Sequence, residues 1–404
     1  MADRIEHIVV LGSQPEWLSG LRGPMLRDFV ARGYRVTAIG SEDMADVRAV
    51  LESWGVAYEV VPLRRAGLNP LRDLASCWAL WRTLRRLRAD LILAYTLKPV
   101  VYGMPVAWLA GVRRRFAMIT GRGYAFLEGP ELSRRVSRTV ATALYRFSLR
   151  FADGVLFHNE DDHAFFRRQR MVGPRAATRR IWGSGIDLNR HTPAPLPPVG
   201  GERPVRFLMI GRLIRDKGVN EFADAAAILR GQGRDAQFRL VGPLDPSPNA
   251  VPSEAIAHWA EAGTIDYAGP ADDVRPEIAA AHVVVLPSYS EGLPRSVLEG
   301  MAAGRPVITT LAPGCRDTVE DGVSGLLVPV RDAAALAGAM SRFIADPDLI
   351  GRLGAAALAR ARDRFDVSSV NADIADFLAL GPLCNESDPV RGHSPAIEPG
   401  SARR

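Results

Sequence analysis

Short apolar runs alternate with longer amphipathic segments along most of the chain. In the first half the runs are residues 5–12 (IEHIVVLG), 34–40 (YRVTAIG), 56–63 (VAYEVVPL), 90–96 (DLILAYT), 115–120 (RFAMIT) and 154–159 (GVLFHN). Helix-length segments lie between them, including 23–32, a segment from about Pro70, 99–112 and 133–151. Because these runs are apolar on both faces of a strand, they predict a parallel sheet covered by helices.

A second series of the same kind follows a proline-rich segment. Residues 192–204 (TPAPLPPVGGERP) contain five prolines and two adjacent glycines, which is typical of a semi-rigid linker. Beyond it, strands are predicted at 205–213, 237–243, 282–288, 305–310 and 325–330. The pattern therefore predicts an α/β protein with two Rossmann-like, doubly wound parallel-sheet domains facing a cleft, which is where such sheets bind ligands.

The predicted boundaries follow from these breaks. We expect an N-terminal Rossmann-like domain over residues 1–191, a linker over 192–204 and a C-terminal Rossmann-like domain over 205–365. A helix over 366–382 follows, for which crossing back to the first domain is one possible path. The polar, proline-containing residues 383–404 predict a disordered tail.

Charge and composition narrow the function. The net charge is +6, but residues 1–198 hold 30 Lys and Arg against 18 Asp and Glu, whereas the remainder holds 21 against 27. A basic first half suits anionic lipid or phosphorylated substrates, and no nucleic-acid-binding module is recognised. The longest apolar stretch, 99–112, is shorter than the roughly 20 residues of a membrane-spanning helix. With no signal-peptide pattern, we expect a cytoplasmic protein, with the inner face of the cell membrane as one location.

The most informative segment is PSYSEGLPRSVLEGMAAGRPVITT, residues 287–310. A buried strand leads into a loop with Glu291 and Gly292, and a helix is predicted to begin near Pro294. Glu291 therefore lies beside the free N–H groups of a helix start, which bind anions, and Glu299 follows inside the helix. An isolated pair of this kind is usually a loop carboxylate and a solvated helical one. At the strand ends of a second Rossmann-like domain, it favours a nucleotide ligand.

Several motifs in order resemble the retaining glycosyltransferases of family four, which have the two-domain GT-B fold. They are GRLIRDKG, LVGP, the segment 287–310 and PGCRDTVEDGVSGLLVP, and the resemblance extends from residue 5 to about 380. YTLKPVVYG, ITGRGYAF, VLFHNEDD and GSGIDL are similar to the subgroup that glycosylates lipid-diphosphate-linked acceptors, including N-acetylgalactosaminyltransferases.

The resemblance implies that the first domain, 1–191, binds the acceptor and that the second, 205–365, binds the nucleotide-sugar. It also implies a role for each matching residue. Glu291, Arg212 and Lys217 would be catalytic: Glu291 would contact the donor sugar, while Arg212 and Lys217 would hold the diphosphate. Glu299 would bind the ribose, and backbone amides of Gly292, Leu293 and Arg295 would hold phosphate or sugar oxygens. Fixed cations stabilise the charge that develops on a diphosphate leaving group, so no metal or other cofactor is expected.

Other candidates are weaker. Gly211 opens the GRLIRDKG loop, and Gly12 ends the first strand, where a phosphate approach and an ordinary tight turn are equally open readings. The chain has only two lysines, Lys98 and Lys217. Lys98 either meets an acceptor diphosphate or is a solvated loop residue. Many family members carry a histidine near the reacting carbon, but ITGRGYAF has none. We expect His158 to be structural and Asn159 to face the cleft.

The sequence thus predicts a retaining glycosyltransferase. Its expected partners are a UDP-sugar that supplies a hexose or N-acetylhexosamine, a polyprenyl-diphosphate-linked saccharide of bacterial surface-glycan assembly, and an anionic membrane surface. Two other functions stay open: a UDP-N-acetylglucosamine 2-epimerase, which shares the fold, and a non-catalytic nucleotide-sugar-binding protein. For the predicted helix from Pro70 to Arg88, with Trp78, Trp81 and five arginines, membrane contact and ordinary packing are both open.

Overall fold

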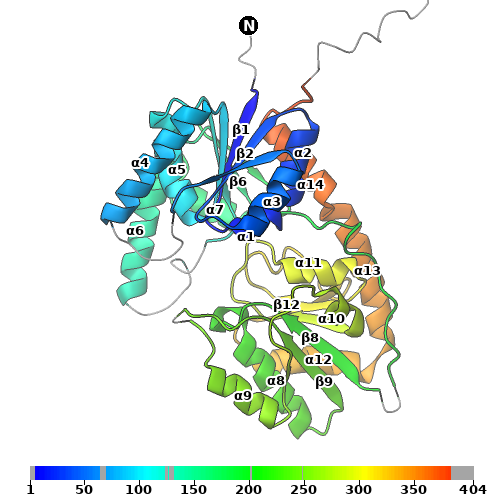
Figure 1. The fold of residues 1–404 in the computed structure, drawn as a ribbon. Coiled ribbons are helices and arrows are strands. Elements are labelled where there is room, and N and C mark those ends of the chain that lie inside the picture. Colours follow the sequence, from blue (N-terminus) through cyan, green and yellow to red (C-terminus); the bar gives the residue numbers. More distant parts are fainter. Residues whose placement is uncertain are drawn as a thin grey trace, which may run out of the picture.

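The structure is a computed structural model that describes residues 5–63, 70–122, 126, 132–200, 203–247 and 249–383. Figure 1 shows two α/β domains, one above the other, with the C-terminal helices running along one side of both. The predicted pair of doubly wound parallel-sheet domains is confirmed. Most of the predicted tail, 384–404, lies outside the described residues.

The first sheet has seven parallel strands in the order β3-β2-β1-β4-β5-β6-β7. Their bounds are β1 His7–Leu11, β2 Arg35–Gly40, β3 Val56–Val60, β4 Leu91–Tyr95, β5 Arg114–Ile119, β6 Gly154–Phe157 and β7 Ala177–Arg180. The order reverses between β1 and β4, which register with Ile8 opposite Leu91. Ligands bind beyond the carboxyl ends of the strands at such a reversal.

Helices cover both faces of this sheet. On one face lie α4 (Pro70–Leu87), α5 (Leu97–Leu109), α6 (Leu132–Ser148) and α7 (Glu160–Arg168), which share one apolar core. On the other lie α1 (Pro15–Ser19), α2 (Gly23–Ala31) and α3 (Ala45–Ser53). The last helix of the chain, α14 (Val367–Phe377), packs beside α2 on that face, so the chain returns to its first domain (Figure 1).

The second sheet repeats the same winding with six parallel strands in the order β10-β9-β8-β11-β12-β13. They are β8 Val205–Ile210, β9 Ala236–Val241, β10 Asp266–Tyr267, β11 Val283–Leu286, β12 Val307–Thr310 and β13 Gly325–Val328. Its helices are α8 Val219–Gly231, α9 Ser253–Glu261, α10 Arg275–Ala280, α11 Arg295–Ala302, α12 Ala333–Ala345 and α13 Asp348–Arg364. The reversal lies between β8 and β11, which places the segments after these strands side by side.

Details differ from the sequence prediction. The helix expected over 133–151 is α6 followed by a separate 3-10 turn, Leu149–Phe151. Pro294 is not in the helix: it is an extended N-cap, and α11 begins at Arg295. The strand β7 was not predicted, because its sequence ATRR is polar and carries no apolar run. Within the described ranges, no helix combines the length and apolarity that crossing a bilayer requires.

Arg305 fastens the interdomain linker to the second domain. Its side chain is fully buried and donates hydrogen bonds only to backbone carbonyls, including Ala194 (2.8 Å) and Pro195 (2.8 Å) of the linker and Ala279 (2.9 Å) of α10. Among the described residues no carboxylate is bonded to it, so carbonyl dipoles compensate the buried charge, and burial lowers its pKa.

We expect Arg305→Met to lower the free energy of unfolding of the second domain by about 2–4 kcal/mol, because buried carbonyls lose their donors. Urea unfolding followed by tryptophan fluorescence measures this change. Arg203→Met, at an exposed position of the same linker, is the control and should unfold like the parent. Equal unfolding of the two variants would contradict the anchoring role.

Candidate active site

Two loops at the β8/β11 reversal form the centre of the site. After β8 the chain passes through Gly211 and Arg212 into a 3-10 turn, Arg215–Lys217, which ends at Gly218 in the left-handed region (φ 76°). A β-carbon at Gly218 would lie 2.2 Å from the carbonyl oxygen of Pro287, so only glycine fits between the two loops. The loop that carries Lys217 is therefore packed directly against the loop that follows β11.

Side-chain and backbone hydrogen bonds lock these loops together. The Ser288 hydroxyl and the Tyr289 amide both donate to the carbonyl of Asp216, at 3.0 and 2.9 Å. Lys217 then forms an ion pair with Glu291, in which Nζ donates to Oε1. Because both side chains are largely shielded from solvent, at 22 and 12% exposure, the pair is held in one arrangement.

The first domain touches this centre through backbone and one amide side chain. Asn159, fully buried at the end of β6, donates from Nδ2 to the carbonyls of Gly292 (2.9 Å) and Glu291 (3.2 Å). Its Oδ1 accepts from the Asp162 amide and caps α7, and Asp162 is paired with Arg122. A β-carbon at Gly292 would lie 2.0 Å from the carbonyl oxygen of Thr120, just beyond β5. The Glu291 loop is thus held between the domains.

Glu299 lies deeper, on the buried side of α11. It accepts a hydrogen bond from Arg295 Nε at 2.7 Å, and Nε2 of His191, the residue before the linker, lies 3.8 Å from its Oε1. Burial raises the pKa of Glu299, against the lowering effect of Arg295. Burial together with the Arg295 charge lowers the pKa of His191 to about 4, so this imidazole is neutral at pH 7.

Arg212 and Lys98 are both engaged in ion pairs. Arg212 Nη1 donates to Asp245 at 2.8 Å and keeps about two fifths of its side chain exposed. Lys98, the other lysine, lies at the start of α5 in the first domain and is bound to Asp73 at 3.0 Å. The second domain thus brings Lys217 to Glu291, whereas Lys98 belongs to the helix layer of the first domain.

Gly12 has a packing reason of its own. A β-carbon there would lie 2.2 Å from the hydroxyl of Tyr95, which is buried at the end of β4. Arg22 is also buried. Its guanidinium carbon lies 4.8 Å from the centroid of the Tyr95 ring, and its Nη1 donates a hydrogen bond to the hydroxyl of Ser184, after β7, at 3.0 Å. His158 is buried nearby, and burial together with the Arg22 charge keeps its pKa well below the ordinary value.

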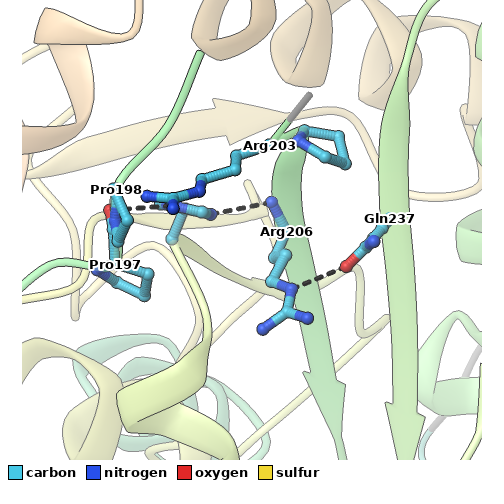
Figure 2. Close-up of a pocket in the computed structure, with 7 residues that line it drawn as sticks. Pro197, Pro198, Arg203, Arg206 and Gln237 are labelled. Carbon is cyan, nitrogen blue, oxygen red and sulfur yellow. Dashed lines mark hydrogen bonds between the residues drawn. The ribbon is translucent and has the colours of Figure 1, made fainter. Parts of the chain in front are cut away.

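A hollow of about 310 Å³ on the second domain lies away from this site (Figure 2). Its lining residues come from the linker and from the amino ends of strands β8, β9 and β11, the edge opposite the Lys217 and Glu291 loops. Three of its polar side chains already have partners. His282 accepts from the Arg206 amide and donates to the Pro197 carbonyl, and Arg206 donates to Gln237 at 2.6 Å. We therefore assign no ligand to it.

Sequence reasoning missed three residues of the site: Asp245, Asp162 and His191. Asp162 lies in the first turn of a helix, and Asp245 and His191 lie in loops. None of them has a regular sequence spacing that would identify it as a site residue. Among the described residues, no group of three or more His, Cys, Asp or Glu side chains is placed to hold a metal ion.

Two Rossmann-like domains with the candidate site between them are the arrangement of the GT-B class of glycosyltransferases, and comparison with known proteins agrees. Residues 24–181 match the family model described as a glycosyl transferase 4-like domain, and residues 204–346 match the one described as glycosyl transferases group 1. The chain therefore belongs to this two-domain glycosyltransferase family and is a glycosyltransferase, as the sequence predicts.

Individual relatives cover most of the chain. An N,N'-diacetylbacillosaminyl-diphospho-undecaprenol alpha-1,3-N-acetylgalactosaminyltransferase of Campylobacter jejuni is 28% identical over 338 residues, which is 81% of this chain and 86% of that protein. The Escherichia coli protein WcaL, a putative colanic acid biosynthesis glycosyltransferase, is 28% identical over 80% of this chain and 78% of its own length.

Solved structures share the fold. Anabaena HepE, crystallised with UDP and glucose, superposes with a TM-score of 0.71 at 24% identity, over 93% of this chain and 100% of that one. A sucrose-phosphate synthase of Thermosynechococcus elongatus gives a TM-score of 0.74 at 20% identity, over 93% and 98%.

The Gly292 contact yields a direct prediction. Gly292→Ala should reduce transfer activity at least tenfold, by roughly the factor expected when a catalytic group is misplaced, because the new methyl group forces the loop away from Thr120. Initial rates and thermal unfolding are measured together. Gly338→Ala, on a helix with nothing within 4 Å of the added carbon, is the control and should remain active. A fully active Gly292→Ala protein would show that the contact is dispensable.

Asn159→Ser separates capping from positioning. Serine can still accept from the Asp162 amide at the start of α7, but it cannot donate to both carbonyls of the Glu291 loop. We expect kcat to fall roughly tenfold or more, with a smaller relative change in donor KM. Asn189→Ser, at an exposed position, is the control. A pure loss of thermal stability with unchanged kcat would assign Asn159 to folding alone.

Proposed function

We propose that the protein is a retaining glycosyltransferase that transfers a hexose or N-acetylhexosamine from a UDP-sugar to a polyprenyl-diphosphate-linked saccharide. The observation that carries this proposal is the Lys217–Glu291 pair at the β8/β11 reversal, held against the first domain by Asn159. The site provides a cation for a diphosphate and a carboxylate for sugar hydroxyls within one rigid unit.

The choice of donor and acceptor is supported by the relatives. HepE, which shares the fold, is crystallised with UDP and glucose, and the Campylobacter relative is named for an undecaprenol-diphosphate-linked acceptor. Lys217 and Arg212 would stabilise the UDP leaving group, so a metal is not required for that charge. Glu291 would orient the donor sugar, and Glu299 would bind the ribose hydroxyls.

The reaction needs few groups from the chain. The bond between the anomeric carbon and the diphosphate oxygen breaks, and the acceptor hydroxyl forms the new bond on the same face. Its proton passes to the leaving phosphate oxygen. In this scheme the chain's residues hold and orient the two substrates, hold the developing charge and exclude water between the domains.

The test uses a panel of UDP-sugars with membrane lipid extract as acceptor, and products are identified by mass spectrometry. Glu291→Ala and Lys217→Ala should each lower kcat/KM by roughly a hundredfold to a thousandfold. Lys217→Arg should also lose most activity, because a planar guanidinium does not replace a compact ammonium in this shielded pair. Arg206→Ala, which removes an exposed cation at the opposite sheet edge, is the control.

Other outcomes assign other functions. Conversion of a UDP-sugar without any acceptor would favour the epimerase, and UDP binding without turnover would favour a binding protein. Full activity of both alanine variants would overturn the assignment of the site.

A further inference from the structure

Large apolar side chains are exposed on two helices of the first domain. They come from α4 and α6 and form what we call the α4–α6 surface: Leu71, Leu74, Trp78, Val136, Val140 and Phe147. Leu71 is 81% exposed and Trp78 is 58% exposed. Large apolar side chains exposed in this number on one side of a domain are unusual for a surface that faces only water, and they mark an interaction site.

The core does not require these residues. The inner side of α4 fills the core with Leu80 and Leu84, and that of α6 does so with Ala141 and Tyr145. Trp78 instead stacks on Trp81 with ring centroids 4.9 Å apart, so the exposed indole is held in place by a partly buried neighbour. The helices are anchored by one face and present apolar groups on the other.

The same helices are basic. Described side chains include Arg72, Arg82, Arg85 and Arg86 on α4 and Arg138 and Arg146 on α6, against one acid, Asp73. Asp73 is already bound by Lys98 and Tyr102. Along α4, Leu71, Leu74, Trp78, Arg82 and Arg85 follow one another at helical spacing, so an apolar stripe continues into a basic one. Apolar groups beside arginines complement an anionic lipid surface.

The position of the surface suits a lipid-bound substrate. In a parallel sheet each helix that follows a strand begins at the carboxyl edge, and α4 follows β3 while α6 follows β5. Leu71, Leu74 and Val136 therefore lie in the halves of their helices nearer the cleft, and Val140 lies at the middle of α6. Figure 1 shows α4 and α6 on the same side of the first domain, with α5 between them.

We propose that the α4–α6 surface docks on an anionic phospholipid bilayer. This inference rests on the proposed function, because a polyprenyl-linked acceptor keeps its lipid in the bilayer while its diphosphate lies at headgroup level. Docking through these helices brings the cleft to that level. The apolar side chains enter the interface, and the arginines contact lipid phosphates.

The test is vesicle co-sedimentation of the full chain, without substrate. Wild type should bind phosphatidylcholine vesicles that contain phosphatidylglycerol, and less so at high salt. The triple variant Leu71→Ser, Leu74→Ser, Trp78→Ser should bind roughly tenfold more weakly or worse. Arg82→Gln with Arg85→Gln should lose mainly the phosphatidylglycerol-dependent part. The control, Val50→Ser with Val323→Ser, removes exposed apolar residues elsewhere and should bind like wild type.

The other outcomes overturn the proposal. It fails if wild type binds no vesicles, if the triple variant binds as wild type does, or if light scattering shows that the triple variant splits a dimer. Transfer from a UDP-sugar to acceptor lipid dispersed in detergent, without vesicles, should be the same for wild type and the triple variant. If neither transfers sugar, the proposed function fails, while the vesicle result still tests the surface.

Discussion

The close contact between the Gly292 backbone and the chain just beyond β5 is the constraint on which the site depends. Three glycines make it possible. Gly121 lies opposite Gly292 with φ 131°, and a β-carbon at Gly314 would lie 2.3 Å from the Glu291 carbonyl. Asn159, which is buried, donates hydrogen bonds to the backbone carbonyls of Glu291 and Gly292. The position of Glu291, a residue of the second domain, is consequently determined by contacts with both domains.

The ion pair at Lys217 depends on this same packing. The topology places the β8 and β11 loops side by side, and Gly218 lets them pack in direct contact. The ammonium group of Lys217 therefore meets the carboxylate of Glu291. A guanidinium carries its charge over a plane and needs more room. In a chain whose only other lysine is Lys98, this accounts for a lysine at 217 in terms of space as well as charge.

The sequence was sufficient for the fold and for the loops of the second domain. Buried parallel strands are readable because they are apolar on both faces, and a doubly wound order then predicts that the β8 and β11 loops are neighbours. The approach of His191 to Glu299 could not be predicted from the sequence, because it depends on the path of the chain between the domains. Gly12 shows the same limit: its glycine is explained by Tyr95, 83 positions away, and no local pattern encodes that contact. The polar strand β7 is recognisable only by its pairing with β6.

The arginine-rich composition takes two different forms in the two domains. Three cations around the site are paired with carboxylates: Lys217 with Glu291, Arg212 with Asp245 and Arg295 with Glu299. Such pairs keep the cations ordered in the absence of a ligand, and the proposed diphosphate would replace or share an existing partner. On α4 and α6 the arginines stand among exposed apolar groups with only one acid on the described parts of both helices. Ordered ion pairs favour the recognition of one small ligand, whereas a face with basic and apolar side chains favours contact with an extended surface. Under these two proposals, the charge difference between the two halves of the chain corresponds to two kinds of partner, a lipid surface for the first domain and a diphosphate for the second.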